Sequence, residues 1–311
     1  MKPDSSIKPS LVCAIVVTYH PDLVALQNLL AALRNQVATI LIVDNGSSSD
    51  SIAWMAAQQE EKLIFFPLEQ NLGVAAAHNH AIRWAQHGGF THVVLFDQDS
   101  VPFPDMIKQL LAGEAELLRM GLKVAAVGPQ YFDPRLSRPA PFTQLVRFKS
   151  IRAYCKNDEQ VFHPADSLIS SGMLMRISIL NEVGLMDKRL FIDYVDIEWC
   201  LRAKHMGYQC FGVCSAKMHH TIGDRVISWR NGKRMIPIHS PMRNYYLMRN
   251  AILLYKRNYI SVTWMLRDAY RLLLRYVFFS LLVSPRFSNF RMLTIGLWHG
   301  INGITGKFPE C

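Results

Sequence analysis

The chain has 311 residues, and half of them are hydrophobic, so a substantial core can form in one large domain or two smaller ones. Its net charge of +10 is uneven: residues 225–311 carry 14 Lys and Arg against two acids, whereas residues 1–224 are close to neutral. The first ten residues lack the apolar core of a signal peptide, and no stretch offers about 20 uncharged apolar residues, so we expect no clear membrane span.

Strands and helices alternate over residues 11–128. Continuous apolar runs predict buried strands at 11–18, 40–43, 63–66, 93–96 and 124–127. Apolar or alanine residues at helical spacing predict helices at 23–33, about 50–59, about 74–88 and 104–120. This alternation predicts an α/β fold with a Rossmann-like, mostly parallel sheet flanked by helices. No G-x-G-x-x-G follows the first strand and no P-loop is present, which argues against those two nucleotide-binding families.

After Gly128 the pattern is less regular. Residues 129–142 contain four prolines and predict a loop. Beyond the turn at Ser170–Gly172 we expect a short helix ending at Gly184, a helix starting near Asp196 and a strand over 208–213.

The strand at 93–96 runs directly into Asp97, Gln98 and Asp99. In open α/β sheets ligands bind beyond the carboxyl ends of the strands, and two acids there can hold a divalent cation that binds phosphate oxygens. The alternative is that these acids cap the helix starting near Pro104.

Two other stretches offer similar pairs of interpretations. Asp44 either caps the turn at Asn45–Gly46 or accepts hydrogen bonds from a nucleotide base or ribose. Gly73, at the start of an alanine-rich helix, either lets a ligand approach the backbone or packs tightly against the sheet.

Three acids lie within six residues at Asp193, Asp196 and Glu198, beside aromatic and aliphatic residues. They form either a solvated helix start or a partly buried carboxylate suited to general base catalysis. Farther along, His219 and His220 follow a strand, and we favour His220 as a possible metal ligand.

Eight stretches, in this order, resemble those of the bacterial rhamnosyltransferases of glycosyltransferase family two, enzymes with the GT-A fold. The resemblance covers about residues 12–255. The stretches are IVVTYHP, VDNGSSSD, NLGVAAAHN, LFDQDS, SSGMLM, LFIDYVDIEWCLRA, HHTIGD and SPMRNYYLMRN.

The resemblance implies a role for each matching residue. Asp196 would be the catalytic base, although Val195 stands where the family usually has Glu, so that Asp193 and Glu198 stay open as alternatives. A divalent metal, Mg²⁺ or Mn²⁺, would be held by Asp97, Asp99 and His220. The residues implied for the donor are Thr18, Tyr19, Asp44, Asn71, Gly73, Asn79, Asp97 and Gln98. The residues implied for the acceptor are Ser171, Gly172, Asp193 and Trp199.

The implied reaction is inverting transfer of L-rhamnose from dTDP-L-rhamnose to a hydroxyl of a glycan or polyprenyl-linked acceptor. Such a step belongs to the biosynthesis of cell-surface polysaccharide of the lipopolysaccharide O-antigen type. The alternatives are another sugar nucleotide, or a non-enzymatic α/β regulatory module with a basic, anion-binding tail. We expect a GT-A domain over residues 1–225, with a nucleotide-binding half at about 11–128 and an acceptor half at about 129–225. Residues 226–311 would form a closing segment and a helical extension.

Residues 250–284 are both basic and apolar. Arg267, Arg271 and Arg275 recur at helical spacing among leucines and phenylalanines. This pattern predicts an amphipathic helix on the anionic inner face of the cytoplasmic membrane, and not nucleic-acid binding. A core or homodimer role is the alternative. Basic groups between Arg225 and Arg249 are expected to close over the donor diphosphate.

The six cysteines are scattered and include no C-x-x-C pair. We therefore expect free thiols in a reducing compartment, consistent with a cytoplasmic protein peripheral to the membrane, and no structural zinc.

Overall fold

The structure is a computed structural model that describes residues 11–58, 60–135, 139–146, 149–155, 161–221, 225–229 and 234–309. The expectation about a signal peptide concerns residues 1–10 and therefore lies outside the described residues. The same holds for Cys311 and for the basic side chains between 225 and 237.

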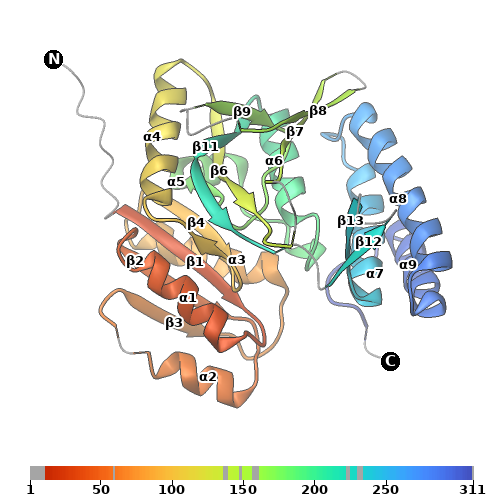
Figure 1. Ribbon diagram of the computed structural model, residues 1–311, viewed down its shortest axis with the longest axis horizontal. Coiled ribbons are helices and arrows are strands. Elements are labelled where there is room, and N and C mark those ends of the chain that lie inside the picture. Colours follow the sequence, from red (N-terminus) through yellow and green to blue (C-terminus); the bar gives the residue numbers. More distant parts are fainter. Residues whose placement is uncertain are drawn as a thin grey trace.

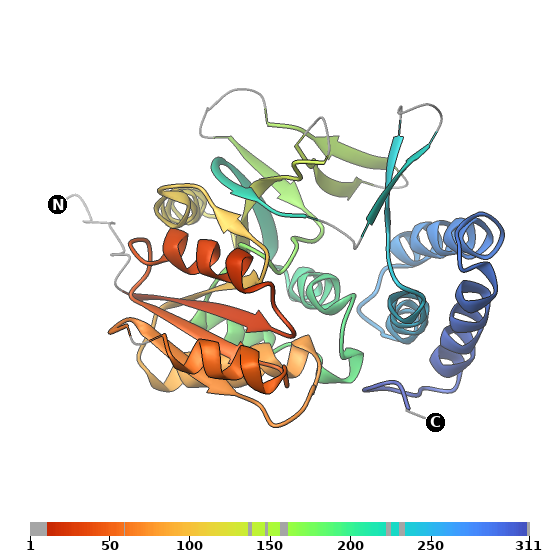
Figure 2. The same ribbon diagram turned by 60° about the horizontal axis from the view of Figure 1, so that its bottom comes forward.

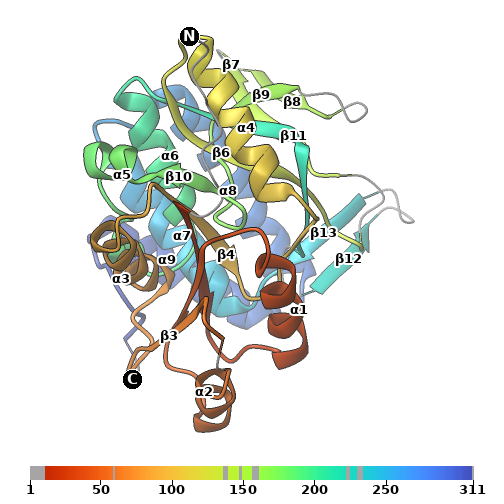
Figure 3. The ribbon, with the colours of Figure 1, turned by 90° about the vertical axis from the view of Figure 1, so that its left-hand side faces the viewer.

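A mixed β-sheet forms the centre of the molecule, with helices on both faces (Figures 1 and 3). Its strand order is β3-β2-β1-β4-β10-β6-β11-β5, and β9 also pairs with β11. The strands are β1 (Val12–Thr18), β2 (Thr39–Asp44), β3 (Leu63–Pro67), β4 (His92–Asp97), β5 (Val101–Pro102), β6 (Val124–Phe132), β9 (Phe162–Ala165), β10 (Leu174–Arg176) and β11 (Gln209–His219). The helices around it are α1 (Leu23–Leu33), α2 (Ser49–Ala56), α3 (Val74–His87), α4 (Met106–Arg119), α5 (Ile177–Val183) and α6 (Val195–His205).

Strand β1 shows why the sheet is buried on both faces. Val12, Ala14 and Val16 belong to the core layer under α1 and α4, whereas the alternate residues face the layer containing α3, α5 and α6. The whole strand is buried, as its unbroken apolar run predicts. Figure 3 shows α1 and α3 on opposite sides of this strand.

The predicted mostly parallel sheet is confirmed. β1 is parallel to β2 and β4, β2 to β3, and β6 to β11. The short β10 lies antiparallel between β4 and β6, and β5 and β9 lie antiparallel against β11. The chain order reverses at β1, which has β2 on one side and β4 on the other, and this is the place where open α/β sheets bind ligands.

The region predicted as a loop is partly strand. β6 continues through Pro129 to Phe132, and β11 continues beyond Val213 to His219. Pro129 pairs with Val213 directly before a register shift, so its missing N–H falls where the ladder is already irregular. The hairpin of β7 (Phe142–Val146) and β8 (Lys149–Ala153) follows.

The C-terminal part adds a hairpin and three helices. They are β12 (Arg225–Trp229), β13 (Arg234–Ile238), α7 (Pro241–Tyr255), α8 (Val262–Leu282) and α9 (Arg286–Ile301). Figure 2 shows these helices as a blue group beside the green α6, with α8 and α9 outside α7. A Cβ on Gly296 would lie 2.6 Å from the Tyr245 carbonyl oxygen, so α7 and α9 pack closely there. No helix within the described ranges is long and apolar enough to cross a membrane.

The expected free thiols are wrong for one pair of cysteines. Cys155 and Cys214 form a disulfide across 59 residues of sequence, whereas Cys13, Cys200 and Cys210 are free and buried. Cys214 lies on β11, and the segment after Cys155 leads into β9, which pairs with β11; sequence spacing does not reveal this approach. His163 lies beside the pair, but both sulfur atoms are bonded to each other.

Candidate active site

The register of the sheet brings three polar side chains to one edge. Thr18 pairs with Asp44 across β1 and β2, and Val17 pairs with Asp97 across β1 and β4. The side chains of Thr18 and Asp44 are joined by a 2.8 Å hydrogen bond. The strand-end residues that the sequence predicts to cooperate therefore meet at the switch point of the sheet.

Asp97, Asp99 and His220 lie together at this edge, as predicted. His220 Nε2 is 3.9 Å from Asp97 Oδ2, and His220 Nδ1 is 3.8 Å from Asp99 Oδ1. The carboxylates are partly exposed, whereas His220 is buried. The alternative, in which they cap the following helix, finds no support, because the N-cap of α4 is Asp105 and its side chain makes no capping bond.

Burial and nearby charges shift the pKa of Asp97 in opposing directions, and the net shift is upward. Loss of solvent is the largest influence and raises its pKa, and the nearby Asp99 carboxylate acts in the same direction. His220 and Arg243 oppose this shift. The site thus concentrates negative charge that a cation would stabilise.

The turn at Ser170–Gly172 connects this acid pair to Asp196. The hydroxyl of Ser171 accepts the Asp97 backbone N–H at 3.1 Å, and the Ser170 N–H donates to Asp196 Oδ2 at 3.2 Å. The Gly172 N–H donates to the Leu95 carbonyl at 2.7 Å. A Cβ on Gly172, which has a φ of +80°, would lie 2.5 Å from Pro129. This turn fixes the distance between the two acidic centres.

Asp196 lies in the first turn of α6. Its Oδ1 also accepts the Ile197 N–H at 2.8 Å. Burial raises its pKa to about 6, and the Asp97 carboxylate adds to the shift, while the two backbone N–H groups oppose it. A carboxylate with a pKa near 6 is suited to accept a proton at neutral pH.

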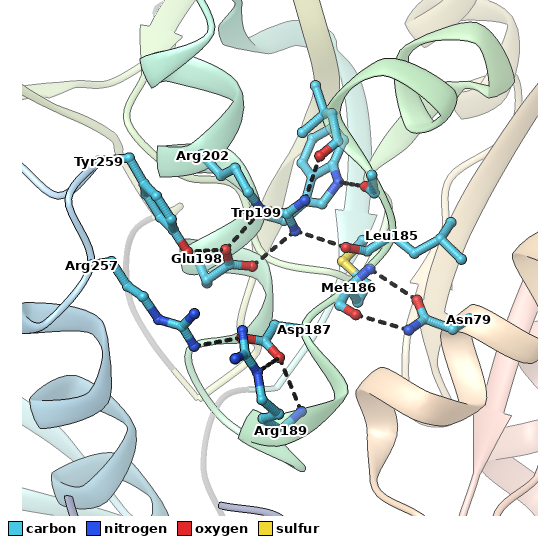
Figure 4. A network of polar contacts seen from close by, with 12 residues as sticks. Asn79, Leu185, Met186, Asp187, Arg189, Glu198, Trp199, Arg202, Arg257 and Tyr259 are labelled. Carbon is cyan, nitrogen blue, oxygen red and sulfur yellow. Dashed lines mark hydrogen bonds and ion pairs between the residues drawn. The ribbon is translucent and has the colours of Figure 1, made fainter. Parts of the chain in front are cut away.

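The two alternative bases are engaged with arginines. Asp193 forms a bidentate pair with Arg243, with N–O distances of 2.8 and 2.7 Å. Glu198 is buried and accepts bonds from Arg202 and from the Tyr259 hydroxyl, on the side of α6 shown in Figure 4. This geometry favours Asp196 over both as a general base.

Asp44 has the turn-capping role foreseen as one of its two interpretations. It is fully buried and accepts bonds from Thr18, from the Ser47 hydroxyl at 2.5 Å and from the N–H groups of Gly46 and Ser47. Its contact with a nucleotide base stays a prediction.

Gln98 and Asn71, two of the residues predicted to contact the sugar nucleotide, hold the loops around the switch point together. The Gln98 side chain accepts the Tyr19 N–H at 2.8 Å, which joins the ends of β1 and β4. Asn71 accepts bonds from the Asn45 amide and from the Gly73 N–H, both at 3.0 Å. Tyr19 itself is 46% exposed, so its ring is available to a ligand.

Three residues predicted to contact a ligand make close contacts with other residues of the protein. Both polar groups of the Asn79 side chain bond to the backbone of Met186, as Figure 4 shows. Gly73 is approached closely by Phe191, because a Cβ there would lie 2.6 Å from both the ring and the carbonyl oxygen of Phe191, and its contact with a donor stays a prediction. Trp199 is fully buried and donates its indole N–H to the Gly184 carbonyl. In this structure all three have packing roles.

The residues predicted to contact the sugar acceptor differ in their exposure to solvent. Ser171 is fully buried and shares a hydrogen bond with the Ser100 hydroxyl, so it shapes the site from beneath. Asp193 keeps a small exposed fraction beside Arg243.

The sequence patterns single out neither Ser100 nor Tyr131, and they include Arg243 only among the basic groups between Arg225 and Arg249. Ser100, fully buried, bonds to His220 Nδ1 at 2.9 Å. Tyr131 packs edge-on against His220, and burial together with the nearby acids raises its pKa to about 12. Arg243 is close enough to Asp97 to influence its charge. Ser100 could have been found from its place directly after the acid pair. Tyr131 carries no such signal, because residues 129–142 predict a loop.

Comparisons with known proteins identify the family of this chain. The family model for glycosyl transferase family 2 matches residues 13–184. The dTDP-rhamnosyl transferase RfbF of Shigella flexneri is 31% identical over 300 residues, which cover 96% of this chain and 97% of that protein. The low-salt glycan biosynthesis hexosyltransferase Agl10 of Haloferax volcanii is 21% identical over 301 residues, covering 95% and 92% of the two chains.

Solved structures show the same fold. S. aureus TarS 1–349 in complex with UDP-GlcNAc superposes with a TM-score of 0.57 at 14% identity, over 94% of this chain and 81% of that one. GalNAc-T7 with UDP, GalNAc and Mn²⁺ superposes with a TM-score of 0.54 at 10% identity, over 84% of this chain and 54% of that one. The predicted GT-A type of α/β fold is thereby confirmed, and the chain is a glycosyltransferase that belongs to glycosyl transferase family 2.

Proposed function

We propose that this glycosyltransferase moves L-rhamnose from dTDP-L-rhamnose to a hydroxyl of a glycan or polyprenyl-linked acceptor, with inversion at the anomeric carbon. The observation that carries the donor is the similarity to the S. flexneri dTDP-rhamnosyl transferase along almost the whole of both chains. Assembly of a cell-surface polysaccharide is the corresponding biological setting.

In this proposal Asp196 is the general base. Its pKa of about 6 leaves it ionised at neutral pH, so it can take the proton of the acceptor hydroxyl as that oxygen attacks the anomeric carbon. The bond between that carbon and the dTDP oxygen breaks, and dTDP leaves. The attack comes from the face opposite the leaving group, so one displacement inverts the configuration.

Asp97, Asp99 and His220 fit a divalent cation. Asp97 lies near Nε2 of the His220 ring and Asp99 near Nδ1, which also bonds to Ser100, so carboxylate oxygens would be the main ligands. Oxygen ligands suit Mg²⁺ and Mn²⁺. A cation bound by these residues would neutralise the diphosphate leaving group. Arg243, which pairs with Asp193, also acts to lower the pKa of Asp97 through its positive charge.

The donor assignment is tested with purified protein and a panel of sugar nucleotides. We expect release of dTDP from dTDP-L-rhamnose, dependent on Mg²⁺ or Mn²⁺, and at most slow release from dTDP-glucose, UDP-GlcNAc and GDP-mannose. Faster turnover of one of these other donors would overturn the rhamnose assignment, while metal-independent release would overturn the role of the acid pair.

We also propose that α8 and α9 bind an anionic membrane surface, which would place the enzyme on the inner face of the cytoplasmic membrane near lipid-linked acceptors. Large apolar side chains stay exposed along α8, and the C-terminal part is strongly basic. The exposed residues of α8 are Val262, Leu266, Tyr270, Leu273, Leu274, Val277, Leu281 and Leu282. Arg271, Arg286 and Arg291 are exposed on the same two helices and supply the charge.

A further inference from the structure

The segment that leads into the proposed base has an unusual backbone. Phe191, Asp193 and Tyr194 have φ values of 66°, 62° and 63°, a region that non-glycine residues seldom occupy. Tyr194 is the residue immediately before α6, and Asp196 is the second residue of that helix. Such a conformation persists only where the surroundings hold it in place.

Two adjacent residues of α7 supply much of that support. The two N–H groups of the Asn250 amide are shared among three carbonyl oxygens of the segment, those of Leu190 at 2.9 Å, Ile192 at 2.7 Å and Asp193 at 2.9 Å. Arg249 Nη2 donates to the Leu190 oxygen at 2.9 Å as well. Both side chains are fully buried.

Arg249 also fixes the orientation of the Asn250 amide. Its Nε donates to Asn250 Oδ1 at 3.0 Å, which leaves the Asn250 amino group facing the segment. The guanidinium itself lies over the rings of Tyr245 and Tyr246, 5.3 and 4.8 Å from their centroids, and donates to the Gly306 carbonyl at 2.6 Å. The pair therefore presents a rigid set of donors.

The aromatic side chains of the segment contact both the start of α3 and the C-terminal helices. Phe191 packs on Gly73 at the start of α3 and stacks on Tyr246 of α7, with ring centroids 5.2 Å apart. Tyr194 donates its hydroxyl to Asp268 of α8 at 2.8 Å. The segment over residues 190–194 is thus held between α3 and the C-terminal helices.

We propose that Arg249 and Asn250 are positioning residues, which hold the backbone of residues 190–194 and thereby set the place of the Asp196 carboxylate relative to the turn at Ser170. This inference rests on the proposed role of Asp196. It assigns a catalytic purpose to the C-terminal helices that is separate from membrane binding. A small displacement of a reacting group can reduce a rate about 100-fold, so loss of this support is expected to act on turnover.

The test compares Asn250→Ala with Asn244→Ala. Asn244 lies on the same helix, is equally buried and makes its bonds to Asn289 and Arg275, away from the segment. The assay uses the sugar nucleotide that wild-type enzyme turns over fastest in the donor panel, so that a wrong donor assignment does not affect it. We expect Asn250→Ala to lower kcat about 10- to 100-fold with the donor KM within about twofold, and Asn244→Ala to leave kcat within about threefold. Equal kcat values for the two variants would overturn the proposal.

A second pair of measurements separates positioning from loss of folding. Asn250→Asp keeps the side-chain volume but removes the donors, and Arg249→Lys keeps the charge but removes the guanidinium that orients the amide. In both variants we expect faster amide hydrogen exchange over residues 190–198 than in wild type and Asn244→Ala, with the protection of β1 and β4 unchanged. Unchanged exchange over residues 190–198 would contradict the proposal even if activity fell. If Asp196→Asn retained activity while Asn250→Ala lost it, the role of Asp196 would be wrong and the positioning claim would fall with it.

Discussion

Asp196 is the residue on which the proposed chemistry depends most. Replacing it with Asn keeps the size of the side chain and removes the proton acceptor. It keeps only one of the two backbone hydrogen bonds, because the bonds go to different oxygens and an amide has a single accepting oxygen. We expect Asp196→Asn to lower kcat about 10²- to 10⁴-fold, because general base catalysis contributes on that order. The dissociation constant of dTDP, measured by calorimetry, should change less than threefold. Glu198→Gln is the control. It disturbs the ion pair with Arg202, so it should lower the free energy of unfolding, and it should leave kcat close to the wild-type value.

The pKa of Asp196 also predicts a pH dependence. The base works when deprotonated, and its pKa is raised to about 6, so activity is expected at pH 7 and above and lost as the pH falls through about 6. The acidic limb of kcat/KM against pH should therefore have a midpoint near 6. A limb near the ordinary aspartate value of about 4 would show that Asp196 is not the titrating base.

Individual residues also show what sequence can and cannot predict. Asp97, Asp99 and His220 were foreseen because strand ends are visible as apolar runs that stop at polar residues. Asn79 and Trp199 were expected at ligands and instead bond to nearby protein backbone. Whether a polar helix residue faces a ligand or a neighbouring loop depends on tertiary packing, which a short motif does not contain.

At the scale of elements, the contact between α3 and the segment at 190–194 is open to a direct test. Gly73→Ala is expected to destabilise the protein more than Gly89→Ala. Both glycines have positive φ, but a Cβ on Gly73 would overlap Phe191, whereas a Cβ on Gly89 would meet nothing within 4 Å. Gly73 has a φ of 88° and a ψ of 154°, a region that essentially only glycine occupies, which costs a substituted residue about 1–3 kcal/mol. The overlap with Phe191 adds about 1–3 kcal/mol to the loss for Gly73. Urea unfolding measures both, and equal losses would show that Phe191 moves aside freely.

The exposed face of α8 gives a second prediction at this scale. Leu273→Asp combined with Val277→Asp should reduce binding to vesicles that contain phosphatidylglycerol by tenfold or more, because two apolar side chains no longer enter the interface. Val24→Asp on α1, which changes an equally exposed residue away from α8, is the matched control. Binding that is unchanged in the double variant, or a wild-type protein that ignores anionic vesicles, would refute the membrane role.

The elements of the N-terminal half were predictable because each one carries its own signal. Residues 11–128 contain apolar runs and helical repeats separated by turn residues, and the strands and helices lie close to the predicted bounds. The C-terminal part was harder. Residues 250–284 read as one basic and apolar stretch, but α7 ends at Tyr255 and α8 begins at Val262. Arg275 turns inward to Asn244 and does not join an exposed basic stripe.

On the scale of the whole molecule, the N-terminal and C-terminal parts form one catalytic unit. The predicted boundary at residue 225 follows the change in charge, but the core cluster around α3 and α6 also contains Ile238, Met248 and Leu293. Asn250 holds the segment before the proposed base Asp196 from the C-terminal side, and Asp97 comes from the central sheet.

The most direct test of the proposed function follows labelled rhamnose from donor to product. Wild-type enzyme is incubated with dTDP-L-rhamnose carrying a radioactive sugar, Mn²⁺ or Mg²⁺, and a membrane extract containing lipid-linked glycans. We predict label in the lipid-linked glycan fraction, none when the metal is chelated, and none with Asp196→Asn. Label that stays in the donor or appears only as free rhamnose, while another sugar nucleotide labels the same fraction, would contradict the proposal.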